Sequence, residues 1–146
     1  MPVITGVMSD NEWVFETEVN RLKVIPEKEY YLLHSDGAVN TDQFKGVFNA
    51  LLEQMNQHPY RKLFIDIQQM KSTTLAARTW LLVNWIPKFY SQYDGIFYVS
   101  IINTKNFLEA ITIELLAKAV MALGFDIRVT FHKTEEAALS SLDIDT

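Results

Sequence analysis

The chain has 146 residues, of which 49% are hydrophobic and 21% charged, and it carries a net charge of −5 and no cysteine. This length and composition are typical of one globular domain, and the lack of cysteine excludes disulfides and thiolate metal sites. The negative charge argues against nucleic-acid binding and against docking on an anionic membrane, because both need a basic face. The longest apolar stretch, residues 75–86, is interrupted by Arg78 and Asn84, so no membrane span is expected. We expect a cytoplasmic protein.

The N-terminal part is predicted to contain an arm and three strands. Residues 1–11 show no hydrophobic period and are rich in turn formers, which predicts a loose arm ahead of a single domain over residues 12–146. Short runs of strand-forming side chains follow at residues 12–18, 20–25 and 29–34. The turn formers Ser35-Asp36-Gly37 are expected to close the third strand. Strands this close in sequence favour antiparallel pairing.

An amphipathic helix is predicted over Thr41–Gln57, with Thr41 as its N-cap and His58-Pro59 as its end. Apolar side chains recur along it with the helical period, at Phe44, Val47, Phe48, Leu51, Leu52 and Met55. This stripe is expected to face the core and to bury Phe44, Phe48 and Leu51.

Strands and helices alternate over the rest of the chain. Strands are predicted at residues 62–67, 96–102 and 125–131. Helices are predicted from an N-cap among Ser72, Thr73 and Thr74 to beyond a kink at Pro87, then from Thr104 to Leu123, and finally from Thr134. The alternation predicts parallel strands joined by right-handed crossovers, and therefore an α/β fold with a mixed sheet whose initial strands are antiparallel.

The sequence contains no recognisable catalytic or metal-binding pattern. None of its three histidines has a second ligand at metal-binding spacing, and neither a glycine-rich phosphate loop nor a nucleophile motif is present. Asp66 could act as a base, but without a partner it is better interpreted as a hydrogen-bonding residue of a strand edge. We therefore expect no enzyme, no metal and no cofactor.

The segment from Asp66 to Thr74 is the first candidate for a functional site. It runs from the end of a strand into a helix N-terminus, where free N–H groups and the helix dipole favour an anion. The candidate regulatory or anion-binding residues are Asp66, Lys71, Ser72, Thr73 and Thr74. Phosphorylation of a hydroxyl there would add local charge, and we expect any regulation to act at Ser72. Simple N-capping is the alternative, and it explains serine and threonine at these positions by itself.

The second candidate is an aromatic face. Trp85, Phe89 and Tyr93 fall on one side of a helix, and they could bind a protein partner or an apolar ligand if Pro87 lets the helix end swing outward. Packing in the core is the alternative for these side chains. The excess of aromatic residues between Trp80 and Tyr93 also favours a homodimer.

The order of elements and three short segments resemble the SpoIIAA-like (STAS-type) domains, in particular the stand-alone versions of Bacteroidetes-type bacteria. The resemblance covers about residues 12–142 and includes a motif of the form D-x-x-x-M-K-S-x-x-x-x-A-R. Its residues are Leu63-Phe64-Ile65-Asp66-Ile67, Met70-Lys71-Ser72 and Ala77-Arg78, then the strand Phe97–Ile102, the helix from Thr104 and the tail Glu135–Leu139.

This resemblance implies a mixed sheet with helices wound along it, and a regulatory function. The best-known members antagonise anti-sigma factors and are phosphorylated by a partner kinase at a helix N-terminal serine, to which Ser72 is the nearest match. The resemblance therefore implies a non-enzymatic regulatory or protein-interaction module, with a kinase-like anti-sigma factor as its partner. A carrier of a small ligand, a lipid or a nucleotide, is the alternative function for the same fold.

Overall fold

The computed structural model describes residues 13–143, and the predicted arm over residues 1–11 lies outside this part of the chain. Six strands form one sheet in the order β1-β2-β3-β4-β5-β6. The antiparallel strands are β1 (Phe15–Glu16), β2 (Asn20–Ile25) and β3 (Tyr30–Ala38). The strands that continue the sheet in parallel from β3 are β4 (Lys62–Ser72), β5 (Phe97–Ile102) and β6 (Ile127–His132). The predicted mixed sheet with antiparallel initial strands is confirmed.

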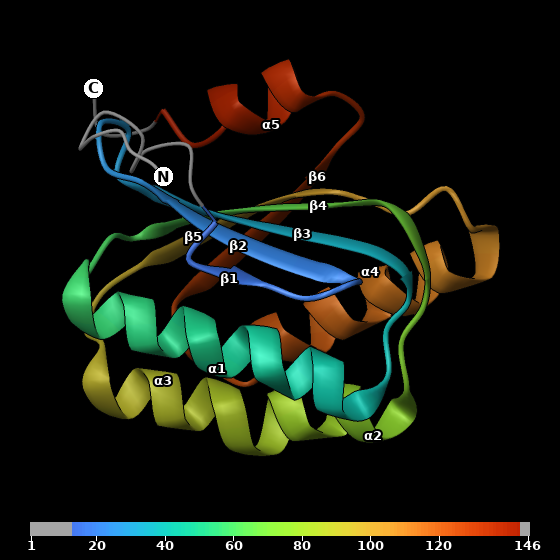
Figure 1. Cartoon of the computed structure of the whole chain (residues 1–146). Helices are drawn as coiled ribbons and strands as arrows, with labels where there is room; N and C mark the ends of the chain where they lie inside the picture. The colour runs from blue at the N-terminus through green and yellow to red at the C-terminus, as the bar shows by residue number, and fades with distance from the viewer. Residues whose placement is uncertain (1–12, 144–146) are drawn as a thin grey trace.

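The helices lie on both faces of the sheet, but unequally. Right-handed crossovers between parallel strands in sequential order all pass over the same face, so the connecting helices form one layer there (Figure 1). This layer contains α1 (Thr41–Gln57), α2 (Leu75–Trp80), the π-helical turn η2 (Leu81–Trp85), α3 (Ile86–Gln92) and α4 (Phe107–Ala122). The opposite face carries α5 (Glu135–Ser140), after the last strand. No helix within residues 13–143 is both long and apolar enough to cross a bilayer.

The main core fills the space between the sheet and the helix layer. Its largest fully buried side chains include Tyr31, Phe89, Phe97 and Leu51. The stripe of α1 faces this core as predicted, with Phe44 and Leu51 buried. Phe48 is only half-buried, because its ring stands at the edge of a cavity.

A smaller core lies on the opposite face, beneath α5. Phe64 of β4 and Ile102 of β5 pack there against Ala138 of α5 and against Leu142. The buried Ser100 hydroxyl of β5 donates a hydrogen bond to the Ala138 carbonyl at 2.8 Å. These contacts attach α5 over the N-terminal half of β4 and the C-terminal half of β5.

Two strands are longer than predicted. The turn expected at Ser35-Asp36-Gly37 is wrong, because β3 continues through these residues to Ala38. The ladder to β4 shifts register between His34 and Asp36 and again after Gly37, whose φ is 65°. Bulges of this kind accommodate turn-forming residues inside a strand, while the parallel neighbour strand still pairs with the backbone N–H and C=O groups on either side of the bulge. Strand β4 correspondingly extends to Ser72.

Two of the predicted helix starts are shifted. Asn40, not Thr41, caps α1, in a capping box with Gln43. Asn106, not Thr104, caps α4, because the Thr104 hydroxyl is used to donate to the Met70 carbonyl of β4. The side-chain oxygen of an N-cap accepts from an N–H group two or three residues further along the chain. The helix therefore starts at whichever polar side chain is placed to reach that N–H group, here an asparagine one or two residues from the predicted cap.

Candidate functional site

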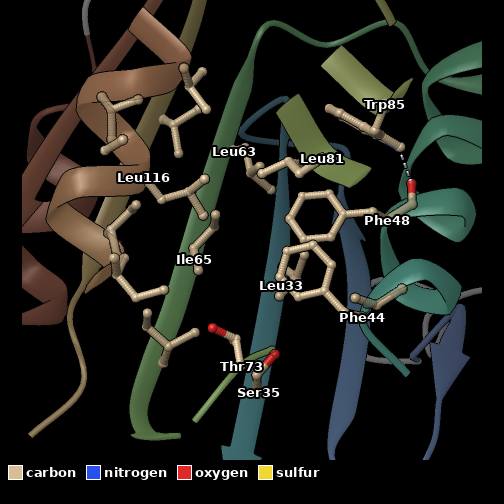
Figure 2. Close-up of a pocket in the computed structure, with 18 of the residues that line it drawn as sticks. Leu33, Ser35, Phe44, Phe48, Leu63, Ile65, Thr73, Leu81, Trp85 and Leu116 are labelled. Carbon is tan, nitrogen blue, oxygen red and sulfur yellow. Dashed lines mark hydrogen bonds between the residues drawn. The ribbon is translucent and has the colours of Figure 1, made fainter. Parts of the chain in front are cut away.

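An apolar cavity of about 120 Å³ lies between the sheet and the helix layer. Its floor consists of side chains from β3, β4, β5 and β6, and its walls come from α1 and η2 on one side and from α4 on the other (Figure 2). Helix α1 packs on β2 and α2, whereas α4 packs on β6, so the helices diverge over the middle of the sheet. The residues labelled in Figure 2 on the walls and floor are Leu33, Phe44, Phe48, Leu63, Ile65, Leu81, Trp85 and Leu116.

The aromatic wall of the cavity is held by specific contacts. The rings of Phe44 and Phe48 stack with centroids 4.8 Å apart, and the ring of Trp85 meets Phe48 edge-on at 5.2 Å. The Trp85 indole N–H also donates a hydrogen bond of 2.8 Å to the Phe48 carbonyl (Figure 2). Since η2 is tied to α1 in this way, the wall cannot collapse into the cavity by a change of one side chain.

The cavity is partly open to solvent. Five of its lining residues, Phe48, Ile65, Thr73, Leu116 and Val129, are only half-buried. Ile65 lies on the central strand β4, where a closed helix layer would bury it fully. An apolar cavity of roughly 150 Å³ is known to hold benzene, so this one has room for about five or six carbon atoms.

The end of the cavity near the C-terminal part of β3, the polar end, is bordered by side chains whose polar groups bond to other protein groups and expose no polar surface to the cavity. Figure 2 shows the hydroxyl groups of Ser35 and Thr73 at this end, away from Leu63 and Trp85. The Ser35 hydroxyl donates to the Asn20 side-chain carbonyl, and both residues are buried. The Thr73 hydroxyl donates to Glu109 Oε2 at 2.6 Å and accepts from the Arg78 guanidinium at 2.6 Å.

No protein-family model and no curated protein matches this sequence. A solved structure does match: an uncharacterized protein from the DUF3478 family of Shewanella loihica PV-4, described as having a SpoIIAA-like fold. It aligns over 88% of this chain and 98% of its own, with a TM-score of 0.53 and 16% sequence identity. This chain has the SpoIIAA-like fold. At this level of identity the likeness shows the fold alone.

Within the SpoIIAA-like fold, the five residues predicted for an anion site do not converge. Thr73 lies at the cavity, and Thr74 is the N-cap of α2, its hydroxyl accepting from the Ala77 N–H. Lys71 and Ser72 are exposed at the end of β4. Ser72 is therefore a strand residue and not a helix cap, and regulation at Ser72 stays a prediction. Asp66 points to the opposite face of the sheet, where it meets His34.

Two of the three residues of the predicted aromatic interaction face are buried and form no exposed surface for a protein partner. Trp85 is 3% exposed and Phe89 is 2% exposed, so both belong to the core. Tyr93 is half-buried and its hydroxyl donates to the Ile96 carbonyl at 2.8 Å. The cause is the start of α3, which includes Pro87 and continues directly from η2, so the helix end does not swing away from the sheet. These aromatic residues consequently give no support to a homodimer, which stays a prediction.

Three residues at the polar end were not predicted from the sequence. Glu109 is 8% exposed within the mostly apolar first turns of α4, and an acid among apolar residues is the signal that could have identified it. Asn20 and Ser35 carry no such signal, because single polar residues in a strand are common. Their proximity depends on the pairing of β2 with β3, in which Asn20 lies opposite Ser35.

A second polar group lies on the opposite face of the sheet. His34 Nε2 is 3.0 Å from Asp36 Oδ1, and His34 Nδ1 is 3.7 Å from Asp66 Oδ2. The Asp66 carboxylate, and to a smaller extent Asp36, raises the pKa of His34 above 6.5, against the effect of burial. Burial raises the pKa of Asp66, but His34 and two hydrogen bonds from Gln68 outweigh burial and hold this pKa below 3.8.

These shifts predict how stability depends on pH. The His34 contribution is complete below pH 6.5 and is lost as pH rises through the folded-state pKa, while the Asp66 contribution is complete above pH 3.8 and is lost on acidification. We expect the free energy of unfolding to fall as the pH rises above 6.5, and this slope to flatten in His34→Gln. Urea unfolding across that range measures the slope. His132→Gln, which removes the histidine at the end of β6, is the control and should keep it, whereas an unchanged slope in His34→Gln would contradict the expectation.

Proposed function

We propose that this chain is a non-enzymatic binding module that holds a small apolar ligand in the cavity between α1, η2 and α4. The observation that carries the proposal is the cavity itself, with about 120 Å³ of space beneath a gap in the helix layer. Ligand sites in proteins are concave and mostly apolar, with a few polar groups that orient the ligand. An apolar ligand suits these walls better than a nucleotide, which would need cations or free N–H groups for its phosphates.

The position of the titratable groups supports binding rather than catalysis. Among the described residues, those that line the cavity carry no histidine, carboxylate or amine. His34 and Asp66, whose pKa values are shifted, lie on the opposite face of the sheet from the cavity. General acid–base catalysis needs such a group within hydrogen-bond reach of the substrate.

Benzene is the direct test of this binding function. Titration of the isotope-labelled protein, followed by NMR, should shift the methyl signals of Ile65, Leu81 and Leu116, which line the cavity. We expect a dissociation constant on the order of 1 mM, which corresponds to a binding free energy of about 4 kcal/mol. For the six carbon atoms of benzene this stays below the ceiling of roughly 1.5 kcal/mol per atom. Absence of saturable shifts at these methyl groups would overturn the proposed function.

Filling the cavity should abolish this binding without unfolding the protein. Ala117 lines the cavity on α4 and is 6% exposed, so leucine there adds three carbons to existing space. We expect Ala117→Leu to leave the free energy of unfolding unchanged or to raise it by about 1 kcal/mol, and to eliminate the benzene shifts. Ala122→Leu makes the same change at an exposed position of α4 and should alter neither quantity. Equal benzene affinity in both variants would place the binding elsewhere.

A regulatory module that binds a protein partner is the second candidate function. It is favoured by the exposed corner formed by Ser72 and Leu75 with Phe107 and Leu108, whose exposed fractions reach 72–75% for the apolar residues. The Thr73–Glu109 hydrogen bond brings the two segments of this corner together. A kinase-like partner of the anti-sigma type would fit the SpoIIAA-like fold, and Ser72 is the hydroxyl that it would modify.

Charge at Ser72 should affect such a partner and not the fold. Ser72 is exposed, so Ser72→Glu should change the melting temperature by less than about 2 °C. Binding to a partner captured from the native cell and identified by mass spectrometry should weaken at least about fivefold, because an unpaired carboxylate would be buried in the interface. Ser72→Ala is the matched control and should bind like wild type. Equal binding by the two variants would leave Ser72 without a regulatory role.

A further inference from the structure

The outer side of α4 is apolar although it faces solvent. Its exposed apolar side chains include Phe107 at 75% exposure, Leu108 at 73%, Ile111 at 42% and Leu115 at 59%. The inner side of the same helix lines the cavity. Because α4 packs on β6, the last strand of the sheet, it is the outermost helix of its layer (Figure 1). A helix that is apolar all round is normally buried on every side, so the outer side of α4 is expected to meet a partner.

The exposed residues of α4 repeat with the spacing of a helix–helix interface. Intervals of three, four, three and four residues separate Leu108, Ile111, Leu115, Lys118 and Ala122. This alternation keeps the five residues, here called the outer stripe, on one side of the helix. Two helices that pack along each other share this spacing, so the outer stripe favours another helix as its partner.

The side-chain sizes along the outer stripe complement each other about Leu115. Leu108 and Ile111 are large and lie on its N-terminal side, whereas Ala119 and Ala122 are small and lie on its C-terminal side. A second α4 that ran antiparallel, with a two-fold axis at Leu115, would place Leu108 opposite Ala122 and Ile111 opposite Ala119. Large side chains opposite small ones let two helices interdigitate. The surface is therefore complementary to itself, as a symmetric dimer requires.

Two opposite charges border the outer stripe in a self-complementary arrangement. Glu114 and Lys118 are both exposed, and residues four apart lie on the same side of a helix. In the antiparallel pair, Glu114 of each copy would lie about two residues, or roughly 3 Å along the helix axis, from the level of Lys118 in the other copy. The symmetry would thus form two ion pairs at one edge of the interface. An unrelated partner would match these charges only by chance.

We propose that a second copy of this chain covers the outer stripe, in a symmetric dimer whose two α4 helices run antiparallel. The side chains of Phe107, Leu108, Ile111 and Leu115 expose on the order of 500 Å², at the upper end for the largest apolar patch of a monomer. A dimer of ordinary size buries about 800 Å² on each partner, so the apolar residues supply more than half of that area. The dimer is weak and reversible, with a dissociation constant on the order of 10 µM. It leaves the inner side of α4 unchanged, so it is independent of ligand binding in the cavity.

Sedimentation equilibrium of the full chain from about 1 µM to about 500 µM measures the association. The mean mass is expected to rise from that of one chain toward that of two. Leu115→Glu should weaken association at least about tenfold, because it places two carboxylates at the two-fold axis. Leu115 is 59% exposed, so this variant should stay folded, which circular dichroism checks.

Val83→Glu is the matched control, because it introduces the same charge at an apolar residue of η2 that is 64% exposed. It should associate like the wild-type protein. A mass of one chain at every concentration overturns the proposal and leaves the outer stripe to a different protein. Equal association by Leu115→Glu and Val83→Glu overturns it as well, since the dimer would then use another surface.

Charge reversal tests the antiparallel arrangement. Glu114→Lys should weaken association about three- to tenfold, because it places a lysine beside Lys118 of the second copy. The double variant Glu114→Lys with Lys118→Glu restores opposite charges and should return the dissociation constant to within about twofold of wild type. Failure of the double variant to recover would overturn the antiparallel pairing.

The lack of cysteine in the chain permits a direct test of the axis. Leu115→Cys gives each chain a single thiol, and oxidation with copper phenanthroline should join two chains by a disulfide, which needs Cα atoms within about 7 Å. Glu53→Cys, at an exposed position of α1, is the control and should remain mostly uncrosslinked. Equal cross-linking of the two variants would contradict a two-fold axis at Leu115.

Discussion

Replacing Phe48 with aspartate is expected to unfold the protein or to lower its melting temperature by at least about 10 °C. The Phe48 ring stacks on Phe44 with centroids 4.8 Å apart and receives the edge of Trp85 at 5.2 Å. Loss of these ring contacts costs about 0.5–1.5 kcal/mol for each pair beyond the lost apolar burial. An aspartate there would also place an unpaired carboxylate in an apolar wall, and the sum approaches the stability of an ordinary domain, roughly 5–15 kcal/mol.

The measurement is thermal unfolding followed by circular dichroism. Phe48→Leu is the matched control, because it keeps an apolar side chain at the same position and removes only the ring. We expect this control to remain folded and to lose about 1–2 kcal/mol. A melting temperature for Phe48→Asp equal to that of wild type would mean that the aromatic wall of the cavity is not built as described.

Truncating Phe89 to alanine is expected to cost about 3–5 kcal/mol of the free energy of unfolding. Its ring lies at the centre of an aromatic cluster, with centroids 5.5 Å from Trp85, 4.8 Å from Tyr93 and 5.0 Å from Phe97. Phe89 is 2% exposed, so removal of the ring leaves a void that these rigid neighbours cannot fill by small movements. Denaturant unfolding measures the loss as a shift of the midpoint at an unchanged slope.

An exposed phenylalanine provides the control for this truncation. Phe107 at the start of α4 is 75% exposed, and Phe107→Ala should stay within about 0.5 kcal/mol of wild type. The pair of variants also separates the two interpretations of the aromatic residues between Trp80 and Tyr93. A small loss of unfolding free energy for Phe89→Ala would indicate that Phe89 is exposed and would support an aromatic interaction face. A large loss would confirm that Phe89 belongs to the core.

The features that the sequence predicts well are those that depend on neighbours along the chain. The helical period from Phe44 to Met55 specifies the buried stripe of α1, because residues three and four apart share a face whatever packs against them. The alternation of strands with helices from Thr41 onward likewise predicts the parallel part of the sheet, with its strands joined by right-handed crossovers. The resemblance to the SpoIIAA-like fold rests on this order of elements together with the motif from Asp66 to Arg78.

The features that sequence patterns predicted poorly depend on contacts between distant residues. Trp85, Phe89 and Tyr93 have the spacing of a helix face, but spacing alone does not tell whether that face meets solvent or the sheet. The course of η2 and α3, with Trp85 bonded to the Phe48 carbonyl 37 residues away, places the first two in the core. Ser35 is a turn former by type, yet its pairing with Asn20 keeps it inside a strand.

The cavity and its polar end also depend on contacts between residues that are distant in the sequence. The cavity exists because α4 packs on β6 while α1 and η2 are joined to each other, and this divergence is a balance of side-chain volumes that no local pattern encodes. Glu109 and Thr73 are 36 residues apart and meet at 2.6 Å only once β4 and α4 are in place. Local periodicity thus determines the elements and their order, whereas the shape of the cavity and the hydrogen bonds at its polar end arise from long-range packing.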